Sequence, residues 1–317
     1  MAVTSEQALL SPQHAALREA QQQVNQVVLG KDQQVELAFA TLLAGGHLLI
    51  EDLPGVGKTT LAHALALTLG LDYNRIQFTS DLLPADVLGV SIYHNAENRF
   101  DFHPGPVFSQ VVLADELNRA TPKTQSSLLE AMAEGQISID GNTRALPQPF
   151  FVIATQNPLD LVGTYPLPDS QLDRFLLNIS LGYPSREAER RLLQEDTRAN
   201  LLIELKPVLN AQSLGELKAA VRKVHTSDAL LDYIQDLVAA TREHPKFVAG
   251  LSPRATLALI AVSRALAFLR GREYVIPEDI KTVFPPLARH RLQVRSTEGD
   301  RNSDRLIQVL LEEVAIP

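Results

Sequence analysis

The sequence predicts an α/β fold in which a parallel sheet core, flanked by helices, is followed by an all-helical domain. Short apolar runs that alternate with helical stretches are typical of a parallel sheet covered on both faces. One of these runs leads into EDLPGVGKTT, which resembles a loop that cradles phosphate. Beyond residue 184 the apolar spacing is mostly helical, so we expect a core over residues 1–184 and a helical domain over 185–317.

The elements of the core follow from local patterns. Two helices are expected between about residues 11 and 44, separated at VVLGKDQ. A helix over residues 121–135 has Thr121 as its N-cap, Pro122 at its first position and Gly135 at its C-cap. The expected strands cover residues 47–52, 73–78, 110–116, 149–157 and 175–181.

Two patterns mark helix starts in the second domain. Ser213 and Glu216 have the spacing of a capping box, and Ser252 followed by Pro253 reads as an N-cap before a proline at the first helical position. We therefore expect a small helical bundle.

Composition limits the class of protein. The chain has 317 residues, 45% of them hydrophobic, which is long enough for one large or two ordinary domains. No run approaches the ~20 apolar residues of a membrane span, and the N-terminus lacks the pattern of a signal peptide, so we expect a cytoplasmic protein without membrane insertion. The absence of cysteine excludes disulfides and thiolate chemistry. A formal net charge of −8 argues against a broad nucleic-acid-binding face.

The stretch EDLPGVGKTT lies between a predicted strand and a predicted helix, where a phosphate loop belongs, although Asp52 replaces its usual first glycine. That replacement is compatible with the loop if the Asp52 side chain points away from the phosphates. Backbone N–H groups and the positive end of the helix would bind the phosphates. Lys58 would reach the β and γ phosphates, and the Thr59 hydroxyl would ligate Mg²⁺. The predicted loop contacts are Pro54, Gly55, Val56, Gly57, Lys58, Thr59 and Thr60.

Polar residues at two later strand ends would complete the site. Asp115 closes the run VVLAD and would hold Mg²⁺ together with Thr59. Glu116 would polarise the attacking water as a general base. Asn157, at the end of the next strand, would orient that water. These residue types indicate hydrolysis of a nucleoside triphosphate.

Several motifs together resemble a known family. EDLPGVGKTT, VVLADELNRATPKTQSSLLEAMAEG, FFVIATQNP, PLPDSQLDRF and LSPRA occur in the order and spacing of AAA+ ATPases, which are P-loop NTPases with a helical lid domain. DELNRATPKTQSSLLEAMAEG resembles the MoxR family, in the helix-2-insert branch, very closely. The resemblance covers about residues 20–290 and is far more specific than any single motif.

The resemblance implies further roles. Gly55, Gly57, Lys58 and Thr59 match the Walker A loop, Asp115 and Glu116 match Walker B, and Asn157 matches sensor 1. Arg174 matches the arginine finger, which in this superfamily reaches the nucleotide of a neighbouring subunit. Arg254 matches sensor 2, a lid arginine that contacts phosphate. In VVLGK, Val28 and Gly30 match the segment that lies against adenine.

Two inserted segments are expected. Residues 86–105 would form the helix-2 insert that the resemblance implies. Residues 135–146 alternate around Asp140-Gly141 and predict a hairpin, which in the family precedes sensor 1. His94 and His103 show no metal-ligand spacing.

The resemblance implies Mg²⁺-dependent ATP hydrolysis by a homo-oligomeric ring, expected to be a hexamer, that remodels, activates or assembles client proteins. A von Willebrand factor A domain protein is the expected partner. Four alternatives stay open: an ATPase subunit like that of magnesium chelatase, a nucleic-acid motor, which the charge disfavours, a GTPase, and a nucleotide-binding module without turnover. The GTPase is disfavoured because the N-K-x-D motif would need a lysine where Asn157-Pro158-Leu159-Asp160 has proline.

Overall fold

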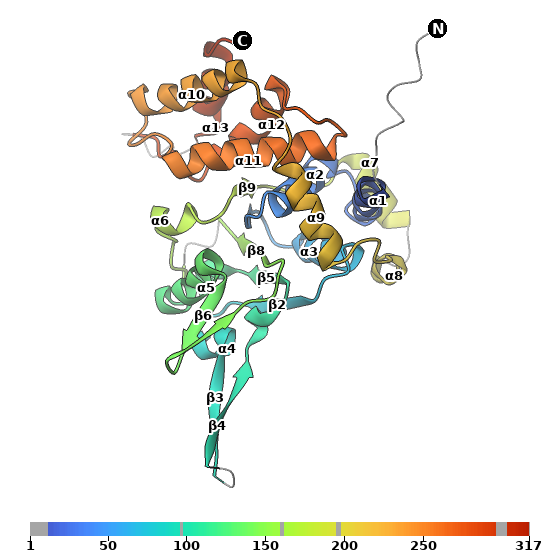
Figure 1. Ribbon diagram of the computed structural model, residues 1–317, viewed down its shortest axis with the longest axis vertical. Helices are drawn as coiled ribbons and strands as arrows, with labels where there is room; N and C mark the ends of the chain where they lie inside the picture. Colours follow the sequence, from blue (N-terminus) through green and yellow to red (C-terminus); the bar gives the residue numbers. More distant parts are fainter. Residues whose placement is uncertain (1–11, 96–97, 159–161, 195–197, 296–302, 317) are drawn as a thin grey trace.

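The computed structural model describes residues 12–95, 98–158, 162–194, 198–295 and 303–316 (Figure 1). The N-terminal residues on which the signal-peptide prediction rests, up to residue 11, lie outside these ranges, as do residues 96 and 97 of the predicted insert. Within the described ranges, no helix combines the length and apolar character that crossing a bilayer requires.

The described residues form a central sheet of five parallel strands in the order β2-β5-β8-β1-β9. The strands are β1 (Leu48–Glu51), β2 (Tyr73–Gln77), β5 (Val111–Asp115), β8 (Phe151–Gln156) and β9 (Leu177–Ile179). Each lies within a predicted strand range, so the predicted parallel sheet is confirmed. Because the strands are parallel, their carboxyl ends meet along one edge of the sheet.

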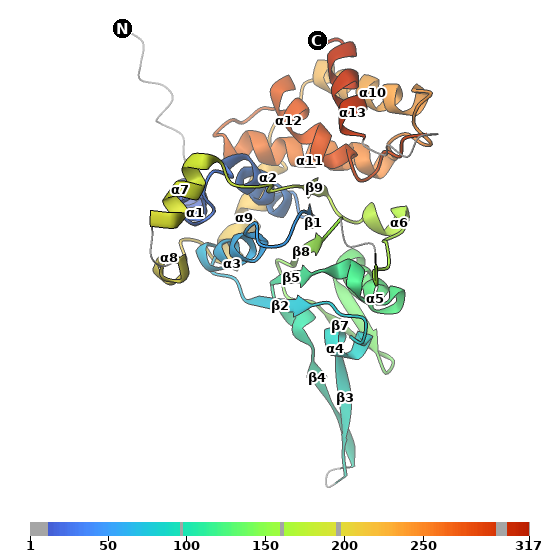
Figure 2. The ribbon, with the colours of Figure 1, turned by 180° about the vertical axis from the view of Figure 1, so that it is seen from behind.

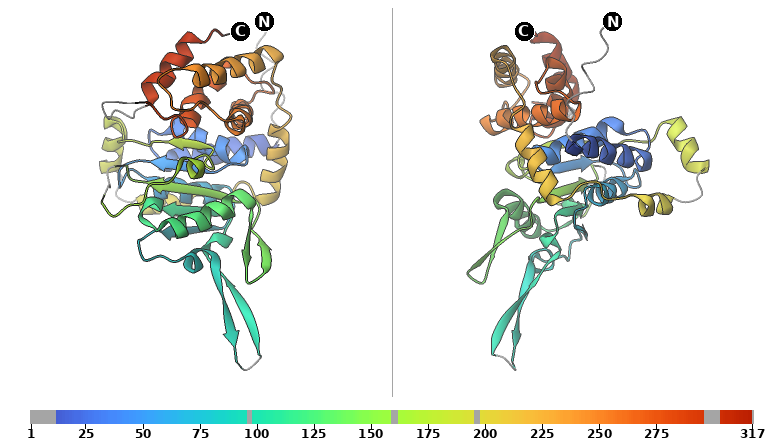
Figure 3. Two further views of the ribbon diagram at one scale, coloured as in Figure 1. Left: turned by 90° about the vertical axis from the view of Figure 1, so that its left-hand side faces the viewer. Right: turned by 45° about the vertical axis from the view of Figure 1, so that its right-hand side comes forward.

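Helices cover both faces of the sheet (Figure 3). One face packs against α1 (Pro12–Val27), α2 (Asp32–Leu43) and α3 (Lys58–Thr68). The other packs against α4 (Pro84–Leu88) and α5 (Pro122–Glu134). Successive strand residues point to opposite faces, so Leu113 of β5 belongs to the first core and Val112 to the second. Burial on both sides explains why the strands read as nearly continuous apolar runs.

Two hairpins extend from the second face. β3 (Gly89–His94) and β4 (Arg99–Pro104) pair antiparallel and project far from the body of the molecule (Figures 1 and 2). β6 (Gln136–Ile139) and β7 (Asn142–Ala145) form a shorter hairpin around Asp140 and Gly141, which both have positive φ. This second hairpin confirms the one predicted from the Asp-Gly turn.

The helices after residue 184 occupy two places. Those that close the chain gather at one end of the molecule: α10 (Asp228–Glu243), α11 (Pro253–Leu269), α12 (Pro277–Ala288) and α13 (Asp304–Glu313) (Figure 2). The helices α7 (Arg186–Gln194), α8 (Arg198–Glu204) and α9 (Ala211–Val221) come before them. Of these, α8 contacts α1 and α3, and α9 contacts α2. The boundary at residue 184 stays a prediction.

The predicted helix caps had mixed outcomes. Ser252 accepts a hydrogen bond from the Ala255 N–H and caps α11, as expected. The predicted capping box of Ser213 is wrong, because Asn210 is the N-cap of α9 and Ser213 is its partner three residues later. Thr121 occupies the N-cap of α5 but makes no side-chain cap bond to the helix backbone.

Candidate active site

A cavity of about 380 Å³ opens at the carboxyl ends of β1, β2, β5 and β8. Ligands of open parallel sheets bind outside this edge of the sheet. The residues that line the cavity are Pro54, Gly55, Gly57, Lys58, Thr59, Thr60, Arg75, Gln77, Asp115, Glu116 and Asn157. The fold therefore brings the predicted phosphate loop, both predicted acids and the predicted sensor asparagine to one place.

The loop after β1 has the backbone that phosphate binding requires. Gly55 and Gly57 have φ values of 80° and 101°, a conformation that residues with side chains rarely adopt. Because α3 begins at Lys58, the free N–H groups of its first turn point toward the cavity. The Lys58 ammonium donates a 2.8 Å hydrogen bond to the backbone oxygen of Asp52. Burial lowers the pKa of Lys58, against the opposing effect of Asp115, Asp52 and Glu116.

The side chain of Asp52 points away from the phosphate loop. Its carboxylate is buried and accepts hydrogen bonds from the N–H of Leu53 at 2.9 Å, the hydroxyl of Ser180 at 3.1 Å and the N–H of Gly182 at 2.6 Å. The last two groups follow β9, and Lys31 holds the same segment by donating to the Tyr183 oxygen at 2.7 Å. Asp52 therefore ties the loop to the segment that leads into α7, and leaves the phosphate position open.

The carboxylates of Asp115 and Glu116, which line the cavity, already interact with neighbouring side chains. Asp115 accepts hydrogen bonds from Thr155 at 2.6 Å and from Arg75 at 2.7 Å. Glu116 accepts from the Gln77 amide at 2.8 Å and pairs with Arg119 at 3.2 Å.

The backbone of Glu116 is unusual. Its φ of 57° and ψ of 46° are left-handed, which is uncommon for a residue with a side chain and concentrates at functional sites. Together with the hydrogen bonds of the two acids, this turn orients the acids toward the space above the phosphate loop.

Sequence reasoning missed Arg75, Gln77 and Thr155. The period of two along β2 places Arg75 and Gln77 on one face, and this signal is present in the sequence. What the sequence does not reveal is that β2 lies beside β5, where Gln77 is opposite Asp115. Thr155 sits in β8, the other neighbour of β5, so its polar hydroxyl inside an apolar run was the available signal.

A second, smaller pocket adjoins the first and shares Gly55, Gly57 and Thr60 with it. Val28 and Val56 line it, together with Pro184. Its apolar walls suit a flat heterocycle beside the phosphate position. Gly30, also predicted as an adenine contact, is not in this lining. A Cβ on Gly30 would instead meet Ala188 of α7 at 3.3 Å.

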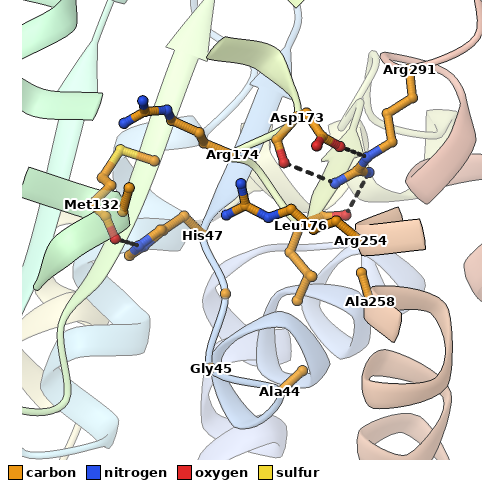
Figure 4. A pocket seen from close by; sticks show the side chains of 12 residues that line it. Ala44, Gly45, His47, Met132, Asp173, Arg174, Leu176, Arg254, Ala258 and Arg291 are labelled. Atoms are coloured by element: carbon orange, nitrogen blue, oxygen red, sulfur yellow. Dashed lines mark hydrogen bonds and ion pairs between the residues drawn. The ribbon is translucent and has the colours of Figure 1, made fainter. Parts of the chain in front are cut away.

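Arg174 and Arg254 line a different pocket, which shares no lining residue with the phosphate-loop cavity (Figure 4). Arg174 follows α6 (Asp169–Leu172) and donates to the Leu129 oxygen of α5. Arg254 is in the first turn of α11, and its side chain makes no hydrogen bond or ion pair with the part of the chain that the structure describes. The structure does not bring Arg254 to the chain's own phosphate loop.

The pocket around the two arginines is cationic. Buried His47 lies on its wall, where its Nε2–H bonds the Met132 oxygen at 3.1 Å and its Nδ1 accepts from the Val152 N–H at 3.1 Å. Burial lowers the pKa of His47 to about 4, and the charge of Arg254 contributes. The ring is thus neutral near pH 7, and the guanidinium groups provide positive charge that suits an anion.

Comparison with known proteins agrees with this geometry. The family described as "ATPase family associated with various cellular activities (AAA)" matches residues 47–177, and an AAA lid domain matches residues 239–309. YeaC of Bacillus subtilis is 44% identical over 307 residues, 96% of each chain. Chaperone MoxR1 of Mycobacterium tuberculosis is 41% identical over 306 residues, 93% of this chain and 81% of that protein.

A solved structure and a more distant relative also resemble the chain. A crystal structure from Cytophaga hutchinsonii, of a protein provisionally assigned as an ATPase, has a TM-score of 0.88 at 38% identity and covers 96% of both chains. The magnesium-chelatase subunit ChlI of Nicotiana tabacum is 29% identical over 249 residues, 74% of this chain and 53% of that protein. The extent and level of identity to the MoxR-named protein exceed those to the chelatase subunit. The chain belongs to the MoxR family of AAA+ ATPases.

Proposed function

We propose that this chain hydrolyses ATP in a Mg²⁺-dependent reaction and uses the energy to remodel, activate or assemble other proteins. The observation that carries the proposal is the convergence of the phosphate loop, Asp115, Glu116 and Asn157 on one cavity. The chaperone name of the Mycobacterium tuberculosis relative supports the remodelling role.

Each group in the cavity has a chemical task. The N–H groups from Gly55 to Thr60 and the Lys58 ammonium bind the phosphate oxygens. The Thr59 hydroxyl and the Asp115 carboxylate are hard oxygen donors of the kind that Mg²⁺ prefers, and the bound ion would neutralise phosphate charge. Glu116 accepts the proton of the attacking water, which the Asn157 amide orients.

The second pocket would receive the base. Val28 and Val56 supply apolar contact to the adenine ring, next to the phosphate-loop residues that the two pockets share. We keep Val28 in this role and leave Gly30 out, because Gly30 packs toward α7.

We also propose that the chain acts as a homo-oligomeric ring, a hexamer in our reading, in which Arg174 completes the site of a neighbouring subunit. The separate pocket of Arg174 supports this, since the arginine lies away from its own phosphate loop. Arg254 lines the same pocket, so we assign it to the same neighbouring nucleotide. The predicted contact of Arg254 with phosphate is kept, and this proposal places it on the neighbouring subunit.

The partner we propose is a protein with a von Willebrand factor A domain, as the family resemblance implies. The projecting β3–β4 hairpin offers a surface for a partner or client, because Tyr93 and Phe100 on it are exposed and in ring contact at 5.0 Å. A role like that of a magnesium-chelatase subunit is the second candidate, favoured only by the similarity to ChlI. It predicts that a porphyrin stimulates hydrolysis.

Two variants test the central activity. Lys58→Ala should abolish binding of a fluorescent ATP analogue, whereas Glu116→Gln should bind it and release almost no phosphate. Lys123→Ala and Glu130→Gln, at exposed positions of α5, are the matched controls and should behave like the parent chain. Unchanged phosphate release by Glu116→Gln would rule out the general-base assignment.

A further inference from the structure

We propose that Arg291 of the helical domain is a positioning residue for Arg174, and that it acts by holding the backbone of residues 173–176, here called the arginine turn. The inference rests on the proposed role of Arg174 in hydrolysis. Arg291 follows α12, whereas the arginine turn belongs to the sheet core between α6 and β9. The contact therefore joins the two parts of the chain at the residue that would serve a neighbouring site.

Arg291 uses all five of its N–H groups, and four of them bind the arginine turn. Figure 4 shows the bonds to Asp173 and Leu176. Its Nε donates to the Asp173 carboxylate at 2.6 Å. Its Nη2 donates to the backbone oxygens of Asp173 at 3.3 Å and Phe175 at 2.6 Å. Its Nη1 donates to the Leu176 oxygen at 3.1 Å and, within the helical domain, to the Leu287 oxygen at 2.6 Å.

These contacts bracket Arg174 on both sides. The carbonyl groups of the residue before it and the residue after it are both bound by Arg291. His290 adds a 3.0 Å hydrogen bond to the oxygen of Phe175, and the Leu176 N–H donates to the His47 oxygen at 2.7 Å. The backbone that carries Arg174 is thereby fixed between the helical domain and the start of β1, while its guanidinium donates to the Leu129 oxygen of α5.

The chemistry of Arg291 fits a role in positioning Arg174 better than a role in packing the protein interior. Its side chain is only 6% exposed, and burial lowers its pKa against the opposing effect of Asp173. Burying a charge costs free energy that apolar packing would not, so stability alone gives weak reason to place arginine here. A planar guanidinium has five donors and can make all five of these hydrogen bonds, whereas a lysine has only three donors.

The consequence for hydrolysis follows from geometry. A displacement of about 1 Å in a group that contacts the transition state costs roughly 10²-fold in rate. A movement of α12 would move Arg291 and, with it, the backbone that carries Arg174. The position of the helical domain in one subunit would therefore set the rate of ATP hydrolysis in the neighbouring subunit.

The test compares Arg291→Lys with Arg289→Lys. Arg289 is a nearby arginine of the same domain that pairs with Asp304 at 3.3 Å and does not bind the arginine turn. The full-length chain is assayed for binding of a fluorescent ATP analogue and for phosphate release. Arg291→Lys should bind the analogue like the parent and lose roughly 10²-fold in kcat. Arg289→Lys should match the parent in both measurements.

A double-mutant cycle separates positioning from general damage. In the Arg174→Ala background, Arg291→Lys should lower kcat no further, because the group that it positions is already gone. Additive losses, or an Arg291→Lys chain as fast as the parent, would overturn the inference. So would a large loss in Arg291→Lys when Arg174→Ala alone has none. If Arg291→Lys does not fold, Asp173→Asn weakens the same contact from the opposite side and is judged by the same outcomes.

Failure of the proposed function looks different. A parent chain without ATP hydrolysis contradicts that function and this inference together, whereas an active parent with a fully active Arg291→Lys variant contradicts this inference alone.

Discussion

The buried hydroxyl group of Thr155 donates a 2.6 Å hydrogen bond to the carboxylate of Asp115. The same oxygen accepts a 2.9 Å hydrogen bond from the N–H of Glu116. One side chain on β8 therefore orients both acids at the end of β5, the proposed Mg²⁺ ligand and the proposed general base.

Replacing Thr155 by valine should impair both acids. The variant keeps the shape of the side chain but leaves the Glu116 N–H without its acceptor, so we expect a loss of about 1–3 kcal/mol in the free energy of unfolding. Loss of a group that orients a metal ligand typically lowers activity roughly 10- to 100-fold. Phosphate release and urea unfolding measure the two effects. Thr155→Ser keeps the hydroxyl and should stay near the parent, and full activity in the valine variant would remove Thr155 from the site.

Asp52 should matter more for stability than for nucleotide affinity. Asp52→Ala leaves the N–H groups of Leu53 and Gly182 without their partner, so the free energy of unfolding should fall by about 1–3 kcal/mol. Because the side chain points away from the phosphates, the affinity for an ATP analogue should change less than about tenfold. Asp52→Asn retains one acceptor oxygen and should lose less stability. A fully stable Asp52→Ala chain that no longer binds the analogue would contradict this reading.

The local part of the site could be predicted from sequence, since a phosphate loop and acids at strand ends are contiguous signals. The order of the strands in the sheet depends on contacts between distant parts of the chain, which no local pattern reveals. The roles of Arg75 and Gln77 depend on this order, because β2 lies beside β5. The contact of Arg291 with Asp173 spans 118 positions and has no local pattern at all.

The pocket that Arg254 lines could not be read from sequence for a related reason. An N-cap and a proline located the start of α11 correctly, but they carry no information on which pocket that helix end faces. At Ser213 the local pattern itself was ambiguous, because Asn210 satisfies the capping geometry with the same serine. Long-range packing and competing local partners were thus the two limits of sequence reasoning.

His47 should make the fold sensitive to acid. Its folded-state pKa of about 4 lies below the ordinary value of 6.5, so protons bind the unfolded chain first as pH falls. The stability from the neutral ring is fully present above pH 6.5 and is lost between pH 6.5 and about 4, approaching roughly 3 kcal/mol. Urea unfolding at several pH values gives the free energy of unfolding as a function of pH. Between pH 6.5 and about 4 this free energy should fall less steeply for His47→Gln than for the parent. His225→Gln, at an exposed position, is the control. An equal pH dependence of the free energy of unfolding in the His47 variant and the parent would contradict the role given to His47.

Arg254→Ala should lower turnover without lowering affinity. If Arg254 serves the neighbouring nucleotide beside Arg174, its loss removes positive charge from the transition state but leaves the chain's own phosphate loop intact. We expect a fall in kcat of roughly 10²- to 10³-fold, the range for loss of one electrostatic donor. Binding of the fluorescent analogue should match the parent. Weaker binding with unchanged kcat would instead favour a contact within the same subunit.

The central claim is that hydrolysis is completed between subunits, and mixing two inactive variants tests it most directly. Arg174→Ala should bind ATP but lose roughly 10³- to 10⁵-fold in rate, as for an arginine finger, whereas Lys58→Ala should not bind ATP. In a mixed ring, the intact Arg174 of a Lys58→Ala subunit faces the intact phosphate loop of an Arg174→Ala subunit. Phosphate release should therefore reappear in mixed rings whose composition is established by native mass measurement. Mixed rings that are confirmed by mass and remain as inactive as the separate variants would show that Arg174 does not act on a neighbouring site.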